Sequence, residues 1–220
     1  MKQKYLMIAV IITMSILFGC NNEGVNEPSD GNMGDTSHTV VARKPNIYLY
    51  PPNKVEMEVF LSFPKGGHIT ESIPKYTDGW LIDVEPSGRI NDNYDYLYYE
   101  CEITDIFQKS EGWLIKGVDV ERFFNANLES YGFNENEKSD FLEYWVPRIE
   151  NEKDYYVYPQ LNSIINQVIE LKLSIVPEES FRLFYLIEAA AGEKVKLMEP
   201  KIKKIRRNGF TLVEWGVIVE

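Results

Sequence analysis

Residues 119–147, DVERFFNANLESYGFNENEKSDFLEYWVP, predict two consecutive helices in the middle of the chain. The first helix begins after Asp119, which can cap it, and ends at Gly132. The stretch Asn134–Glu137 has the pattern of a capping box and starts the second helix, which Pro147 ends or kinks. The apolar positions with helical spacing are Val120, Phe123, Phe124, Leu128 and Tyr131, then Phe141, Leu142 and Trp145. The short connection predicts an antiparallel pair.

The segments on both sides of this helical pair alternate between apolar and polar residues, as β-strands do. The strands expected before the pair are 47–50, 55–63, 80–84, 96–103 and 113–115. The strands expected after it are 169–175, 181–187 and 210–219, and the first two are predicted to form a hairpin. Strands, then helices, then strands predict an α+β fold, an antiparallel β-rich domain with a central helical pair.

Alternation also predicts which side chains of two strands are buried. One face of the strand at 96–103 carries Leu97, Tyr99, Cys101 and Ile103. Cys101 is therefore expected to be a small buried hydrophobe rather than a nucleophile. In the last strand Trp215 is expected in the core, on the same face as residues 213, 217 and 219. Glu214 points the other way, so its substitution by glutamine is expected to change stability very little.

Composition excludes several classes of protein. The chain has 220 residues and a net charge of −11, which argues against nucleic acid as a partner because phosphate binding needs basic patches. Its 2 cysteines exclude a disulfide scaffold and a four-cysteine zinc site. His38 and His68 are its 2 histidines, which leaves little basis for catalytic triads or His-rich metal sites. We expect neither a metal nor another cofactor.

Residues 1–19 have the features of a secretory signal peptide, with Lys2 and Lys4 before the apolar stretch 5–18. A helix of that length spans about 21 Å, less than the roughly 30 Å of a hydrocarbon core, so cleavage is expected rather than membrane spanning. Its end, Leu17-Phe18-Gly19-Cys20, resembles the bacterial lipobox. The resemblance implies that Cys20 is acylated, palmitate being one such acyl group, and becomes the first residue of a lipoprotein.

The rest of the chain divides into a tether and a domain. Residues 20–42 are expected to be the lipidated cysteine and a flexible tether, rich in Asn, Glu, Gly, Asp and Ser. Residues 43–220 are expected to form a single α+β globular domain. The predicted location is the cell membrane, lipid-anchored, on its extracytoplasmic face, because two or three acyl chains anchor a protein stably.

Two further motifs stand at the ends of the domain. Lys44–Pro51 reads KPNIYLYP, and 210–216 reads FTLVEWG. Together they resemble an uncharacterised family of bacterial exported proteins, whose members open with KPxIYLYP and close with VEWGG. Here Val217 replaces the second glycine, and Cys101 stands where a glycine is expected. The resemblance supports the extent of the domain and implies no reaction.

The candidate site residues are aromatic and acidic. Tyr96, Tyr98 and Trp145 are the predicted binding residues, since exposed aromatic rings stack on sugars. Glu100 and Glu214 are weak catalytic candidates, because two carboxylates about 5–9 Å apart can act as acid and base on a glycosidic bond. In that case Trp215 would also stack on the substrate. The competing interpretation is that both glutamates are structural: they cap aromatic strands or pair with Arg43, Arg89 or Arg148.

Two other patterns favour ordinary structure. Asn91, Asn93, Asp95 and Glu102 have part of the spacing of an EF-hand loop, but Tyr96 occupies the position that needs glycine, so an Asn/Asp turn is expected. The basic cluster consists of Lys194, Lys196, Lys201, Lys203, Lys204, Arg206 and Arg207. It is expected to be solvated surface, with contact to anionic lipid or wall polymers as the alternative.

The sequence therefore predicts a membrane-anchored surface lipoprotein with a non-enzymatic domain that binds a protein or a glycan. The alternative is a cell-envelope hydrolase that uses Glu100 and Glu214. A solute-binding lipoprotein of a transporter comes third, because the chain is short for two lobes.

Overall fold

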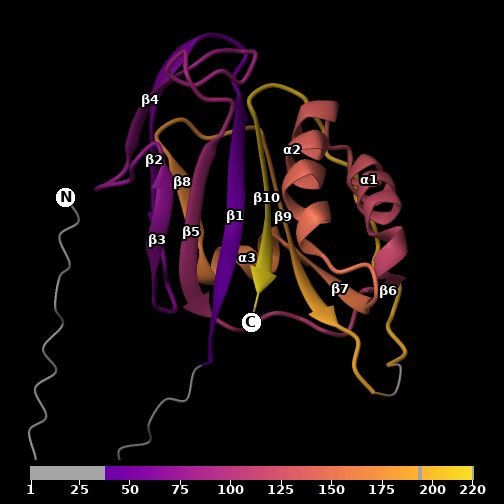
Figure 1. Ribbon diagram of the computed structural model, residues 1–220. Helices are drawn as coiled ribbons and strands as arrows, with labels where there is room; N and C mark the ends of the chain where they lie inside the picture. The colour runs from indigo at the N-terminus through magenta and orange to yellow at the C-terminus, as the bar shows by residue number, and fades with distance from the viewer. Residues whose placement is uncertain (1–37, 193–194, 220) are drawn as a thin grey trace, which may run out of the picture. The chain divides into compact units, whose positions relative to one another are not determined.

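The computed structural model describes residues 38–192 and 195–219. This part of the chain has the α+β fold predicted, with a helical pair between two groups of strands (Figure 1). Its helices and 3-10 turns are η1 (Gly117–Asp119), α1 (Val120–Tyr131), α2 (Glu135–Trp145), η2 (Val146–Arg148) and α3 (Asn162–Val168). Its strands are β1 (Thr39–Tyr50), β2 (Val55–Ser62), β3 (Gly67–Ile73), β4 (Trp80–Val84), β5 (Leu97–Thr104), β6 (Trp113–Lys116), β7 (Asp154–Leu161), β8 (Glu170–Leu173), β9 (Glu179–Ala189) and β10 (Thr211–Val219).

The strands form two sheets. The larger has seven strands in the order β3-β5-β1-β10-β9-β7-β6, and the smaller has three in the order β4-β2-β8, both counted within the described residues. Neighbouring strands run antiparallel except β10 and β9, which are parallel. The last strand thus lies in the middle of the larger sheet, between β1 and β9.

An apolar core lies on each face of the larger sheet. The first core fills the space toward the smaller sheet and α3, with Ile47, Met57 and Ile165 among its buried side chains. The second core lies under α1 and α2 and contains Tyr48 and Trp215. Figure 1 shows the helical pair on one side of the larger sheet and β4, β2 and β8 on the other.

The helix signals are confirmed except at the first N-terminus. Gly132 ends α1 in the left-handed conformation at φ 92°, and Asn134 with Glu137 forms the expected capping box of α2. Asp119 does not cap α1 with its side chain. A 3-10 turn precedes the helix instead, and the carboxylate of Asp119 accepts a hydrogen bond from Arg122 at 2.8 Å.

The burial predicted for β5 and β10 is confirmed. All four side chains on the predicted face of β5 are fully buried, and burial raises the pKa of the Cys101 thiol, as expected for an unreactive cysteine. Trp215 is fully buried beside Phe141, at 5.1 Å between ring centroids. Glu214 faces the other core and is equally buried. The expectation that its substitution changes stability little assumed an exposed carboxylate and loses its support.

The predicted hairpin of 169–175 with 181–187 is wrong. β8 pairs with β2 in the smaller sheet, whereas β9 pairs with β10 and β7 in the larger one. The turn residues between β8 and β9 therefore carry the chain from one sheet to the other. Alternation shows that a segment is a strand, but it does not choose the strand's partner.

The sequence also predicted too few strands and too long a tether. β7 has buried residues on both faces, so it lacks the alternation of a half-exposed strand. β1 begins at Thr39 rather than near residue 43, and Val40 and Ala42 are buried in the first core. The predicted signal peptide and Cys20 lie outside the described residues.

Candidate functional site

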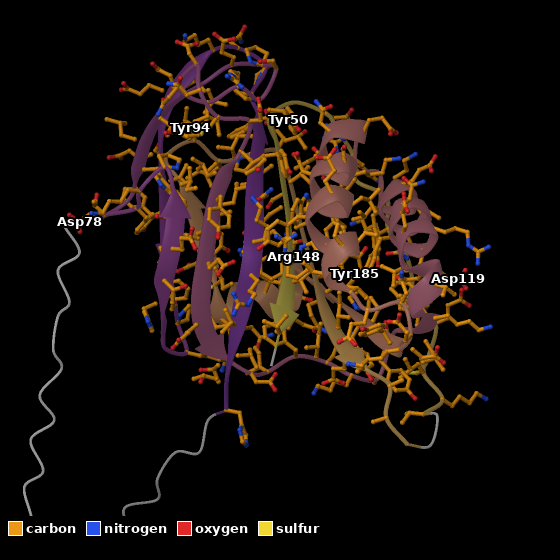
Figure 2. The ribbon with its side chains drawn as sticks, viewed as in Figure 1. Tyr50, Asp78, Tyr94, Asp119, Arg148 and Tyr185 are labelled. Carbon is orange, nitrogen blue, oxygen red and sulfur yellow. The ribbon has the colours of Figure 1, made fainter. Side chains whose placement is uncertain are left out.

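An open pocket of about 570 Å³ lies where the helical pair leaves the larger sheet uncovered. The strands that contribute to the second core are β1, β10, β9, β7 and β6, so the helical pair does not cover the helix-side face of β5 and β3. Tyr98 on that face, expected to be exposed, is only 8% exposed. The pocket is lined by Arg43, Lys44, Glu71, Ile73, Asn93, Tyr94, Asp95, Tyr96, Tyr98, Glu100 and Tyr144. Figure 2 labels Tyr94 from this lining and Arg148, whose guanidinium stacks on the Tyr144 ring at 3.8 Å.

A bulge in β1 places Lys44 in the pocket. The register of β1 shifts against both neighbours between residues 42 and 46. Lys44 has a φ of 53°, a left-handed conformation that costs a residue with a side chain about 1–2 kcal/mol. Pro45 follows it and is buried. The KPN part of the sequence motif thus turns one lysine out of the strand and toward the tyrosines.

Three tyrosines surround the Lys44 ammonium group. Its nitrogen lies 4.4 Å from the ring centroid of Tyr98, 4.6 Å from that of Tyr96 and 5.6 Å from that of Tyr144. It donates hydrogen bonds to Asn46 Oδ1 and Tyr96 OH, both at 3.2 Å. Burial lowers the pKa of Lys44, against the attraction of nearby carboxylates.

A chain of hydrogen bonds connects this lysine to α2. Asn46, which is fully buried, donates to Tyr48 OH at 3.3 Å, and Tyr48 donates to Asp140 Oδ2 at 2.8 Å. Burial raises the pKa of Tyr48 well above its ordinary value, so the hydroxyl stays a donor. Burial also raises the pKa of Asp140, opposed by Tyr48 and Lys44. Asp140 of α2 therefore helps to position Lys44 through its hydrogen bond with Tyr48, which in turn bonds to Asn46.

The acidic side of the pocket comes from two neighbouring strands. Glu100 of β5 lies directly opposite Glu71 of β3 in the antiparallel register. Residues in such positions share one face of the sheet, with Cβ atoms about 4.5–5.5 Å apart. Glu100 is 8% exposed and pairs with Arg43 at 3.5 Å, whereas Glu71 is exposed.

The structure brings together some of the predicted site residues and separates others. Tyr96, Tyr98 and Glu100 line the same pocket. Trp145 packs in the second core and is not among the residues that line the pocket, so it offers no surface for stacking there. The predicted carboxylate pair is not formed, because Glu100 and Glu214 lie on opposite faces of the larger sheet.

The surroundings of Glu214 show why it cannot act in the pocket. Its carboxylate accepts a hydrogen bond from Tyr99 OH at 2.7 Å and an ion-paired hydrogen bond from Arg182 Nε. Tyr99 and Glu100 are consecutive in β5 and therefore point to opposite faces. The competing interpretation of Glu214, a structural partner of an arginine, is the one that the structure supports. Trp215 is likewise fully buried and offers no stacking surface.

Sequence reasoning missed Lys44, Glu71 and Tyr144 as members of the site. It named Arg43 as a possible structural partner of the glutamates, and Arg43 does pair with Glu100. The KPNIYLYP motif did not signal the turn at Lys44, because a residue before proline is expected to be extended, whereas Lys44 has a φ of 53°. Nothing in the sequence indicated that β3 pairs with β5, which is what brings Glu71 beside Glu100.

The segment that resembles an EF-hand forms the expected Asn/Asp turn. Asn91 and Asp92 have left-handed φ values of 48° and 57°, and Asn91 Oδ1 accepts a hydrogen bond from the backbone of Asp83 at 2.8 Å. Among the described side chains, no group of three or more His, Cys, Asp and Glu is arranged to hold a metal ion.

The described part of the basic cluster lies at the surface. Its lysines and arginines from residue 196 onward are exposed, and Lys194 lies outside the described residues. Arg207 donates to Glu137 Oε2 at 2.6 Å and to the carbonyl of Gly132 at 3.1 Å. This arginine therefore secures the connection between α1 and α2.

Comparison of the chain with protein-family models, curated protein sequences and solved structures finds no match. In the part of the chain that the structure describes, no helix is both long and apolar enough to cross a membrane.

Proposed function

We propose that this protein is a lipid-anchored bacterial surface lipoprotein whose domain binds a glycan in the tyrosine-lined pocket. The observation that carries the proposal is the convergence of Tyr96, Tyr98 and Tyr144 with charged hydrogen-bonding groups in one open cavity. Ring faces contact the apolar faces of sugars, while Arg43 and the two glutamates can bond to hydroxyl groups. Binding pockets typically combine aromatic walls with a few placed polar groups in this way.

The proposed anchor follows from the sequence pattern before the domain. The lipobox-like Leu17–Cys20 ends an apolar segment that is too short to span a membrane as a helix. β1 begins at Thr39, which leaves residues 20–38 as the proposed connection between anchor and domain. The proposed location is the extracytoplasmic face of the cell membrane.

Cys20→Ala is expected to abolish incorporation of an alkyne-bearing palmitate analogue, because the acylated thiol is removed. The altered chain should stay uncleaved or leave the membrane fraction. Labelling measured by gel fluorescence after click chemistry checks this, with Cys101→Ala as the control that retains full labelling. Unchanged labelling of Cys20→Ala would contradict the anchor.

Tyr96→Ala is expected to weaken glycan binding by about fivefold or more, since truncating a central aromatic contact that anchors a ligand costs over about 1 kcal/mol. Retention of the full chain on insoluble peptidoglycan and on chitin measures the effect. Phe60→Ala is the matched control, because Phe60 is a partly exposed aromatic in the smaller sheet, outside the pocket. Equal retention of both variants, or no retention of the parent on any glycan, would contradict the proposal.

A glycan hydrolase is the second candidate, now with Glu71 in place of Glu214. Glu71 and Glu100 lie opposite each other in the pocket, and retaining glycosidases place two carboxyl groups about 5–5.5 Å apart. The same glycan samples distinguish the two functions. If the parent releases new reducing ends and Glu100→Gln does not, the result would favour hydrolysis over binding alone as the function.

A further inference from the structure

We infer that the tyrosine pocket selects glycans that carry a free ammonium group, and that Glu71 binds this group. The inference rests on the proposed glycan-binding function and adds the chemical class of the ligand, an amino sugar that is not acetylated. Three observations support it: the contacts of the Lys44 ammonium group, the excess of carboxylates over cations in the pocket lining, and the placement of Glu71 opposite Glu100.

The pocket already holds one alkylammonium group. The nitrogen of Lys44 lies within 4.6 Å of two ring centroids, and two uncharged oxygens accept its hydrogen bonds. Cations lie over aromatic faces at such distances because the ring face is electronegative. Lys44 therefore shows that the faces of these tyrosine rings accommodate an ammonium group.

The lining of the pocket carries three carboxylates, Glu71, Asp95 and Glu100, against the two cations Arg43 and Lys44. Glu100 is paired with Arg43, and Asp95 is paired with Arg89 at 2.7 Å. Lys44 is attracted by Asp140 of α2, and also by Glu100 and Glu71 in the pocket. The Glu71 carboxylate makes no direct ion pair or hydrogen bond in the part of the chain that the structure describes, and Lys44 is a cation that attracts it. The negative charge of the whole chain adds a field in the same direction.

The position of Glu71 makes it a receptor for a cation. Like charges directly opposite each other in an antiparallel pair are destabilising. An ammonium group placed between Glu71 and Glu100 relieves this repulsion and gains two charge-assisted hydrogen bonds. A sugar carboxylate in the same place would meet two carboxylates. A neutral acetamide could donate one N–H to a carboxylate but would not compensate the negative charge of the pair.

Two trisaccharides test the inference, because they differ only in the nitrogen substituent. Isothermal titration calorimetry compares the β-1,4-linked glucosamine trimer with its N-acetylated counterpart on the full chain, at a mildly acidic pH where the amines are protonated. We expect the amine trimer to bind at least about tenfold more tightly, and the ratio to fall when salt is raised.

Glu71→Gln should reduce the ratio below about threefold, because the amine trimer loses much more affinity than the acetylated trimer. Glu58→Gln, an exposed glutamate of β2 outside the pocket, should keep the full ratio. Equal binding of the two trimers by the parent would overturn the ammonium selectivity and leave glycan binding intact. A ratio that survives in Glu71→Gln would overturn the role of Glu71. Binding of neither trimer would overturn the inference, and only with loss of retention on both insoluble glycans would the proposed function fall too.

Discussion

Replacing Glu214 with alanine is expected to lower the free energy of unfolding by about 3–5 kcal/mol, because it leaves a buried arginine without its counter-charge. Glu214 and Arg182 are 0% and 1% exposed, and each bonds to the other in the first core. Arg182 also donates to Asn166 Oδ1 at 2.8 Å and to the carbonyl of Ile169 at 2.6 Å, so it cannot turn toward solvent without losing both. Burial and the Glu214 charge raise the pKa of Tyr99, which keeps its hydroxyl as a donor to that carboxylate.

Urea denaturation followed by circular dichroism measures this loss. Glu85→Ala is the control, since Glu85 pairs with Lys54 at 3.4 Å on the surface and such pairs contribute about 0–1 kcal/mol. The double variant Arg182→Met with Glu214→Met should recover much of the lost stability, because apolar residues of similar volume often replace a buried ion pair without loss. A Glu214→Ala protein as stable as the control would show that the ion pair does not exist in the folded chain.

Trp215→Ala is expected to cost about 3–5 kcal/mol, a large part of the 5–15 kcal/mol that holds a typical domain folded. Trp215 of β10 is fully buried and packs against α2, with its ring centroid 5.1 Å from that of Phe141 and 6.4 Å from that of Tyr48. Removing it opens a cavity where the helical pair rests on the larger sheet. The thermal unfolding midpoint should fall sharply.

Trp215→Phe is the matched variant for this position. It keeps an aromatic ring against Phe141 and removes the indole N–H, which has no hydrogen-bond partner among the described residues. We expect less than half the loss seen with alanine, measured in the same melting experiment. A Trp215→Ala protein that melts like the parent but no longer binds glycan would contradict the core role and assign Trp215 to recognition.

The elements of this fold were largely predictable, whereas their partners were not. The capping box at Asn134 and the left-handed Gly132 depend on interactions within a few residues, so the sequence shows them directly. The separation of β8 from β9 into two sheets depends on contacts between distant parts of the chain. β8 pairs with β2, more than a hundred residues earlier, and β9 pairs with β7, whose partner residues lie 22–34 positions earlier. Pattern within a segment carries no information about such pairings.

The candidate site divides in the same way. Tyr96, Tyr98 and Glu100 alternate in one segment, so their common face could be read from the spacing. Their association with Lys44 requires the bulge in β1, and Glu71 arrives only through the pairing of β3 with β5. Glu214 was misjudged because alternation reports which face a residue occupies, and in a sheet covered on both sides each face is a core.

The insertion of β10 between β1 and β9 has a consequence for how the chain matures. A nascent chain that has reached only residue 210 lacks the strand that joins β3-β5-β1 to β9-β7-β6 in the larger sheet. Both cores then lack a common wall, and exposed strand edges face each other across the gap. Assembly of the larger sheet must wait for residues 211–219, so proteolytic clipping or premature termination just before them yields species that are prone to aggregate and easily degraded.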